Sequence, residues 1–135
     1  MKKFILSCAF FLLTTLAFAQ SIEEKASFLT NQMNTLLSLS TEQVEKVSTV
    51  NIRRFKFEAN SKERLASQPR YEKAKSENFQ SELGQAMLAE INTRMETAEN
   101  RYDALLSKVL DASQYSLYLQ NKQLLLDELK AEFGE

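Results

Sequence analysis

The residues that most often carry catalysis or bind metals tightly are almost absent from this chain. The sequence contains no histidine and a single cysteine, Cys8. A serine or cysteine nucleophile would therefore have no histidine to activate it, and zinc, nickel or copper(II) would lack their usual nitrogen and thiolate ligands. Adjacent acidic residues such as Asp127 and Glu128 point about 100° apart on a helix, which is typical of a solvated face. We therefore predict no enzymatic activity, no cofactor and no metal site.

The chemistry that remains is non-covalent binding by a surface that combines positive charge with apolar area. Residues 53–75 carry eight basic and three acidic side chains, whereas residues 82–135 carry ten acidic and five basic ones. On a helix through this region, Val50 and Phe57 project away from the main apolar stripe, beside basic side chains. Such a ribbon suits weak contacts with unfolded, often acidic chains. The candidate client-binding residues are Val50, Arg53, Arg54, Phe57, Arg64, Lys73 and Lys75.

The same ribbon has a second interpretation, in which Val50 and Phe57 form the seam of a homodimer and the charges only keep the protein soluble. Both interpretations remain open at the level of the sequence. Nucleic acid is disfavoured as the partner of the basic stretch because the chain is predicted to be exported and residues 20–135 are acidic, with a net charge of −3 once Lys2 and Lys3 are left out of the total of −1.

The elements that would position this ribbon are helices. The chain has one proline and two glycines, which leaves few turns, while good helix formers such as Ala, Leu, Glu, Lys and Gln are abundant. Apolar periodicity and capping residues predict helices at about 21–37, 41–66, 71–109 and 112–132, with Pro69 marking a turn or sharp kink. The predicted fold is all-α, with about four helices in an elongated antiparallel hairpin arrangement.

The helix predicted at 71–109 is unusually long for a chain of this size. Its apolar positions are Leu83, Met87, Ile91, Met95, Ala98, Tyr102, Leu105 and Val109, and Gly84 interrupts the stripe. A straight helix over this range would be about 58 Å long, which exceeds the width of a compact monomer formed by residues 20–135. We therefore expect the helix to bend or a second copy of the chain to cover it, and we favour a homodimer.

Two short stretches, "LSLSTEQV" and "KVLDASQY", repeat one pattern seventy-one residues apart. In each, a short polar residue can cap a helix while the glutamine three positions later bonds back to the cap, which is a capping box. An apolar residue before the cap can pack on the fourth helical residue, which is a hydrophobic staple. The predicted motif residues are Leu39, Ser40, Gln43 and Val44 in the first stretch and Leu110, Asp111, Gln114 and Tyr115 in the second.

The N-terminal residues have the features of an export signal. Lys2 and Lys3 precede the apolar run "FILSCAFFLLTTLAFA", which ends in a small-x-small site at Ala17 to Ala19. We predict that residues 1–19 are a signal peptide and that residues 20–135 form one helical domain. A membrane anchor is disfavoured because the run is shorter than the ~20 residues of a spanning helix. Lipoprotein anchoring at Cys8 is a weaker alternative, since hydrophobic sequence follows it.

The paired motifs resemble the two LTxxQ motifs of the Spy/CpxP family of periplasmic proteins. The matching positions are Leu39, Ser40 and Gln43, then Leu110 and Gln114, and the resemblance covers roughly residues 39–125. Ser40 and Asp111 stand where the family has threonine, and both remain competent helix caps.

The resemblance implies a periplasmic protein that forms a cradle-like homodimer and acts as an ATP-independent chaperone on unfolded or partly folded envelope proteins. Other members of the family act on envelope-stress signalling, and some relatives respond to metals. An envelope-stress regulator or adaptor that docks on one membrane partner is therefore the main alternative function. A metal-stress protein and a structural coat or assembly protein are lesser alternatives, and stable membrane insertion is not expected.

Overall fold

The computed structural model describes residues 21–134, and these residues are all-α, without a strand. Residues 21–37 are helical and are followed by α2 (Thr41–Ala66), α3 (Pro69–Ser76), α4 (Glu82–Val109) and α5 (Ala112–Phe133). The predicted all-α class is confirmed. The predicted signal peptide and the lipoprotein alternative at Cys8 lie outside the described residues.

The predicted capping boxes open α2 and α5. The Ser40 hydroxyl accepts a hydrogen bond from the Gln43 backbone N–H at 3.2 Å, and the Ser40 N–H donates to Gln43 Oε1 at 3.0 Å. Asp111 Oδ1 accepts from the Gln114 N–H at 2.8 Å, and the Asp111 N–H donates to Gln114 Oε1 at 3.0 Å. Each box supplies partners for backbone groups that a helix start leaves unpaired, so both helices begin where the sequence predicts.

The region around Pro69 also follows the sequence. Helix α2 ends at Ala66, and Pro69 occupies the first turn of α3, where its missing N–H would have had no helical partner. Helix α5 is capped at its C-terminal end by Gly134, which adopts the left-handed conformation with φ 71°. Glycine favours this conformation at the end of a helix because it has no Cβ.

The single long helix predicted at 71–109 is wrong, because the chain breaks between α3 and α4. Asn78 and Phe79 both have positive φ values, of 51° and 56°. Ser81 then caps α4 by accepting from the Gly84 N–H at 3.1 Å. A Cβ on Gly84 would lie 2.6 Å from the Cα of Phe79. Gly84 is therefore the residue that allows this turn to pack against the start of α4.

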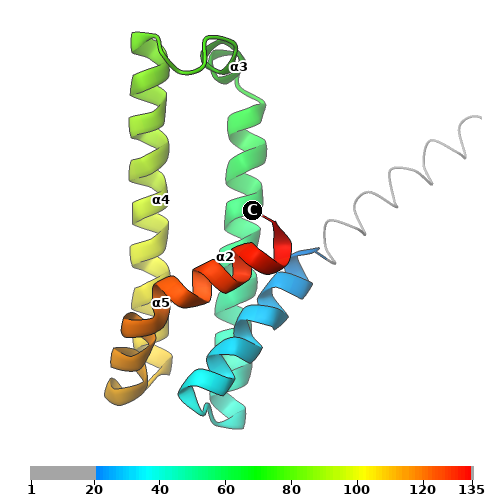
Figure 1. The fold of residues 1–135 in the computed structure, drawn as a ribbon, viewed down its shortest axis with the longest axis vertical. Helices are drawn as coiled ribbons and strands as arrows, with labels where there is room; N and C mark the ends of the chain where they lie inside the picture. Colours follow the sequence, from blue (N-terminus) through cyan, green and yellow to red (C-terminus); the bar gives the residue numbers. More distant parts are fainter. Residues whose placement is uncertain (1–20, 135) are drawn as a thin grey trace, which may run out of the picture.

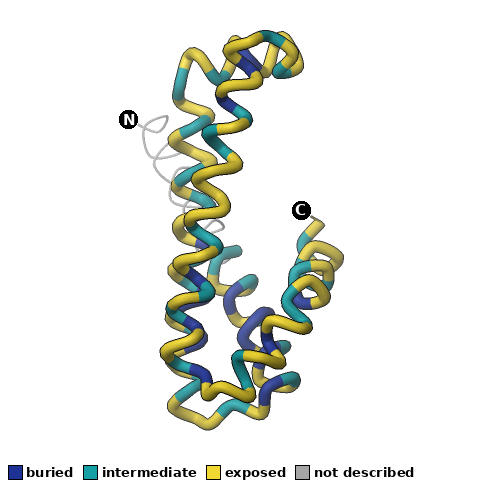
Figure 2. The backbone as a smooth tube through the Cα atoms, turned by 90° about the vertical axis from the view of Figure 1, so that its left-hand side faces the viewer, coloured by how far each residue is buried: buried dark blue, intermediate teal, exposed yellow. Residues whose placement is uncertain are grey.

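The helices divide into a thick and a thin region (Figure 1). Helices α2 and α4 lie side by side in opposite directions, with α3 across one end. Residues 21–37 and α5 pack at the other end, where most buried positions gather (Figure 2). We call residues 21–55 and 98–134 the base, and residues 56–97 the arm. The buried cluster of the base consists of Ala26, Leu29, Met33, Leu37, Val47, Val50, Phe55, Tyr102, Leu106, Leu110, Tyr118 and Leu125.

Some positions of the predicted apolar stripes are exposed. Met95 is 55% exposed, and Leu83 on α4 and Leu119 on α5 are also exposed. Around the α4 axis, Met95 lies within about 20° of the buried Tyr102 and Leu106, which are seven and eleven residues further along the helix. Met95 is exposed because, in the arm, the two packed helices have no further layer that covers this side.

Among the described residues, no helix has the length and apolar character that crossing a membrane would need.

Candidate functional site

A chain of buried polar groups ties the helices of the base together. Asn51 Nδ2 on α2 donates to Thr30 Oγ1 at 2.9 Å, and the Tyr102 hydroxyl on α4 donates to Asn51 Oδ1 at 2.5 Å. Thr30 Oγ1 in turn donates to the carbonyl of Ala26 at 2.7 Å. Because buried polar groups are costly unless they are paired, these bonds fix how residues 21–37, α2 and α4 meet.

Arg54 extends this polar chain from α2 towards α4. Its guanidinium carbon lies 4.4 Å from the centroid of the Tyr102 ring, and its Nη1 and Nη2 donate to the two Glu99 oxygens at 3.2 and 3.0 Å. Burial opposes the charge of Arg54, yet the combined attraction of Glu99, Tyr102 and Glu58 outweighs it, so the pKa of Arg54 is raised. Arg54 thus remains protonated, and the carboxylates of Glu99 and Glu58 balance its positive charge.

Helix α5 joins the same network through Lys122. The Lys122 ammonium lies 2.8 Å from Glu99 Oε1 and 2.7 Å from Asp103 Oδ2. The Tyr118 hydroxyl donates to Asp103 Oδ1 at 2.8 Å. Burial of the ammonium opposes its charge, but hydrogen bonds to Asp103 and Glu99 prevail and raise the pKa of Lys122. Burial is also the main cause of the raised pKa values of Tyr102 and Tyr118.

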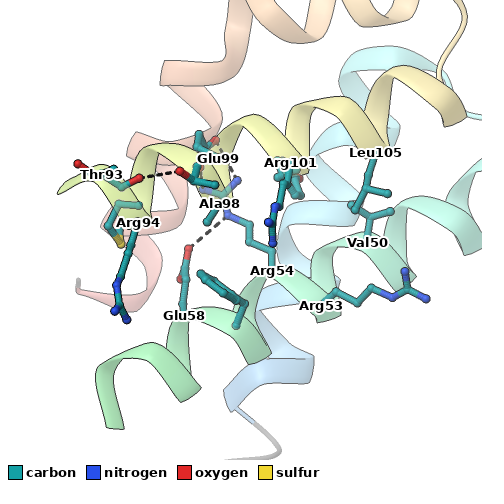
Figure 3. A pocket seen from close by; sticks show the side chains of 14 residues that line it. Val50, Arg53, Arg54, Glu58, Thr93, Arg94, Ala98, Glu99, Arg101 and Leu105 are labelled. Atoms are coloured by element: carbon teal, nitrogen blue, oxygen red, sulfur yellow. Dashed lines mark hydrogen bonds and ion pairs between the residues drawn. The ribbon is translucent and has the colours of Figure 1, made fainter. Parts of the chain in front are cut away.

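A groove of about 470 Å³ lies between α2 and α4 and runs from the base into the arm. Figure 3 shows Val50 and Leu105 pointing towards each other, while the Arg53 side chain extends away from them. The groove combines apolar and cationic side chains from both helices. Its lining residues are Val50, Arg53, Arg54, Phe57, Glu58, Thr93, Arg94, Met95, Thr97, Ala98, Glu99, Arg101, Tyr102 and Leu105.

The apolar part of the groove reaches solvent at two large side chains, Phe57 at 46% and Met95 at 55% exposure. The cations differ in how they are used. Arg94 pairs with Glu90 at 2.7 Å, whereas Arg53 and Arg101 are exposed and form no ion pair with any described residue. Two arginines with uncompensated charge thus belong to the lining of an apolar groove, one from each helix.

The structure brings together four of the seven predicted client-binding residues. Val50, Arg53, Arg54 and Phe57 all line the groove, although Val50 is buried and the side chain of Arg54 is only 10% exposed. Arg64 lies near the end of α2, and Lys73 and Lys75 lie on α3. These last three are exposed residues outside the groove lining.

The sequence-based prediction missed the half of the groove that α4 supplies. Met95, Ala98, Tyr102 and Leu105 were assigned to a core stripe, and Arg101 was not singled out. Met95 shares a face of α4 with the buried Tyr102, seven residues away. Its exposure depends on where the covering layers of the base end, which the apolar pattern does not show.

The two motifs meet directly, which their separate roles as helix caps do not require. Gln43 Nε2 donates to Gln114 Oε1 at 2.7 Å, and Gln114 Nε2 donates to Gln43 Oε1 at 3.1 Å. Gln43 also donates to the Val109 carbonyl, and Gln114 to the Leu37 carbonyl. Each glutamine therefore caps its own helix and bonds the end of the helix that precedes its counterpart. The motifs form a joint on the base rather than a binding site.

The groove presents surfaces suited to non-covalent recognition. Among residues 21–134, no group of three or more His, Cys, Asp or Glu side chains is placed to hold a metal ion. Tyr102 is buried and Arg54 is largely covered, and both are occupied by internal contacts. What the groove offers to a partner is the surface of Phe57 and Met95 and the charges of Arg53 and Arg101.

Comparison with known proteins gives one match. A family model described as a domain of unknown function, DUF4890, matches residues 17–118. No curated protein and no solved structure matches the chain.

Proposed function

The chain belongs to the family described as a domain of unknown function, DUF4890, and we propose that this member is an ATP-independent chaperone that binds unfolded or partly folded proteins. The observation that carries the proposal is the groove between α2 and α4, with Phe57 and Met95 half exposed and two unpaired arginines in its lining. Unfolded segments offer the exposed apolar and acidic side chains that such a surface attracts.

The size of the exposed apolar area suits a chaperone that releases its client without ATP. Fully burying a Phe or Met side chain contributes about 1.5–3 kcal/mol, and here about half of each is already covered. Two such contacts would contribute about 1.5–3 kcal/mol, to which arginine contacts at the surface add about 1 kcal/mol each at most. A single segment would therefore bind weakly and dissociate readily.

The wider setting of the proposal comes from the sequence. The predicted export signal would direct the protein to the periplasm, and the resemblance of the paired motifs to Spy/CpxP proteins implies a cradle-like homodimer. In such a dimer, two antiparallel α2–α4 pairs would present two grooves to one client. Two linked weak sites bind more tightly than either alone without losing rapid local exchange.

The first experiment is an aggregation assay on several unrelated unfolding proteins, without nucleotide. The purified protein is expected to suppress their aggregation at near-stoichiometric ratios. Protection of none of them would contradict the chaperone proposal. Capture of a single membrane protein from an envelope extract, without protection of the test proteins, would instead support the alternative of an adaptor for envelope-stress signalling.

A matched pair of variants then tests the groove. Phe57→Ser removes an apolar side chain from the groove, and Leu119→Ser removes one of nearly equal exposure, 46% against 47%, from α5 outside it. Phe57→Ser is expected to weaken protection several-fold, while Leu119→Ser retains it. Analytical ultracentrifugation of both variants separates the two interpretations of Phe57, because loss of a dimer in Phe57→Ser alone would identify Phe57 as part of the dimer seam.

A further inference from the structure

Glu99 connects the groove to a helix that takes no part in lining it. Its two carboxylate oxygens accept from Arg54 at 3.2 and 3.0 Å, and Lys122 on α5 lies 2.8 Å from one of the same oxygens. Arg54 and Glu99 both line the groove, whereas Lys122 does not. One carboxylate is therefore shared between the groove wall and α5.

The shared carboxylate depends on the charge of Lys122. Glu99 and Asp103 lie four residues apart on α4, and like charges at this spacing repel each other. The Lys122 ammonium lies within 2.8 Å of both carboxylates and offsets this repulsion. Without that ammonium, the Asp103 carboxylate would repel Glu99 while Arg54 still attracts it. The Glu99 carboxylate would then take a different position.

Arg54 would transmit such a change into the groove. Its side chain is only 10% exposed, its guanidinium lies over the Tyr102 ring, and its buried Nε makes no hydrogen bond. The orientation of Arg54 is therefore set by the Glu99 carboxylate, by Glu58, whose Oε1 lies 3.4 Å from the Arg54 Nε, and by the Tyr102 ring. Tyr102 itself lines the groove beside Val50 and Leu105, so a shift of Arg54 reaches the wall that a client would touch.

We propose that Lys122 is a positioning residue for the groove: by holding Glu99, it holds Arg54 against Tyr102 and keeps the groove wall in its binding shape. As a proposal about client binding, it rests on the proposed function. The link to the shape of the wall can be measured without any client.

The first test follows methionine methyl groups by NMR in the full chain. Met95 lines the groove, and the Met33 sulfur lies 3.7 Å from the Tyr102 hydroxyl. Lys122→Gln is expected to shift both methyl resonances. Lys130→Gln, which removes a charge from an exposed position of the same helix, is expected to leave both in place, and Lys122→Arg should restore the wild-type positions. Equal spectra for Lys122→Gln and Lys130→Gln would overturn the proposal.

The second test measures binding of reduced, carboxymethylated α-lactalbumin, which stays unfolded. Lys122→Gln is expected to weaken its affinity on the order of five-fold, within the range for substitutions along a coupled network, and Lys130→Gln less than two-fold. Circular dichroism confirms that each variant is folded, and Lys122→Leu replaces Lys122→Gln if the latter does not fold.

The outcomes separate the positioning role from the proposed function. If the wild-type protein binds no unfolded chain, the proposed function fails, while the Met95 resonance still decides whether Lys122 sets the groove wall. If Phe57→Ser weakens binding but Lys122→Gln behaves as Lys130→Gln does, the groove function stands and the positioning role of Lys122 is wrong.

Discussion

The base and the arm are built from the same two long helices but differ in what covers them. In the base, residues 21–37 and α5 add further layers to α2 and α4, and almost all buried side chains lie there (Figures 1 and 2). In the arm, α2 and α4 have only α3 and each other, and the buried residues are Ala74, Gly84 and Met87. The two long helices thus contribute to a buried core at one end and to an exposed surface at the other.

The two regions also use their polar residues differently. In the base, Asn51, Tyr102, Arg54 and Lys122 are engaged with partners from other helices. In the arm, the ion pairs of Arg70 and Arg94 with Glu90 connect exposed side chains, and such pairs contribute little to stability. The groove crosses from one region to the other, so it combines a fixed wall in the base with the accessible side chains Phe57 and Met95 in the arm.

The largest predicted effect is a truncation in the base. Leu106 is fully buried, so Leu106→Ala is expected to lower the free energy of unfolding by about 3 kcal/mol through lost burial and a cavity. Leu124→Ala removes an exposed leucine of α5 and is expected to change it by less than about 0.5 kcal/mol. Chemical denaturation measures both. A small effect of Leu106→Ala would mean that the base is not the stable region of the molecule.

The next effect should be confined to the arm. Helix propensity alone predicts that Gly84→Ala stabilises α4 by about 1 kcal/mol. The new Cβ would, however, lie 2.6 to 2.9 Å from backbone atoms of Phe79, so we expect a loss of about 1–3 kcal/mol from overpacking. Hydrogen exchange should show faster opening of residues 69–97 and little change in the base.

The control for this substitution is Ala86→Gly, at an exposed position of the same helix. It should cost about 1 kcal/mol through helix propensity alone. If Gly84→Ala proved stabilising, the close approach between Gly84 and Phe79 would be contradicted.

The joint between the two motifs predicts coupling between distant residues. Gln43→Ala and Gln114→Ala should each lower the free energy of unfolding by about 1–2 kcal/mol, since each removes a cap bond and interhelical bonds. Because the glutamines bond each other, the double variant should lose at least about 0.5 kcal/mol less than the sum. Gln123→Ala, which loses only a bond to Asp127 on the same helix, is the control. Strict additivity would mean that the glutamines are independent caps.

Alkaline pH should destabilise the base. Burial raises the pKa of Tyr102 and of Tyr118 above the ordinary value of 10.0. Above about pH 10 the unfolded chain therefore loses protons that the folded chain keeps, and stability falls as pH rises, by up to about 1.4 kcal/mol per pH unit for each group. Below about pH 9 both tyrosines are protonated in the folded and in the unfolded chain, so they do not make the free energy of unfolding depend on pH.

Thermal unfolding measured from pH 8 to 11 tests this sign. Tyr118→Phe should reduce the alkaline loss, whereas Tyr71→Phe, a substitution in the arm, should leave it in place. An unchanged pH profile in Tyr118→Phe would show that burial of Tyr118 does not govern the profile.

The sequence predicts the parts of this fold that local chemistry controls. Ser40 and Asp111, each with a glutamine three residues later, predict where α2 and α5 begin, and Pro69 predicts the break after α2. The break near Asn78 was missed because it depends on the packing of Gly84 against Phe79, and a glycine within an apolar stripe does not reveal its contacts.

The candidate site was predicted only on its α2 side. Arg53 and Phe57 could be recognised because they lie off the apolar stripe of α2. Val50 was expected on the same exposed ribbon, but it packs in the buried cluster of the base. Met95 and Arg101 come to face them only because α2 and α4 pack side by side, which is a tertiary event. The bond between Gln43 and Gln114 is equally non-local, although the equal spacing of the two motifs was visible.

The most direct test of the central claim, that unfolded chains bind in the groove, follows the methionine methyl resonances of the full chain during titration with reduced, carboxymethylated α-lactalbumin. Met95 is exposed in the groove, whereas Met87 is buried outside its lining. We expect the Met95 resonance to shift or broaden on titration while that of Met87 stays in place, and Phe57→Ser to abolish the change. Binding that leaves Met95 unaffected would contradict it.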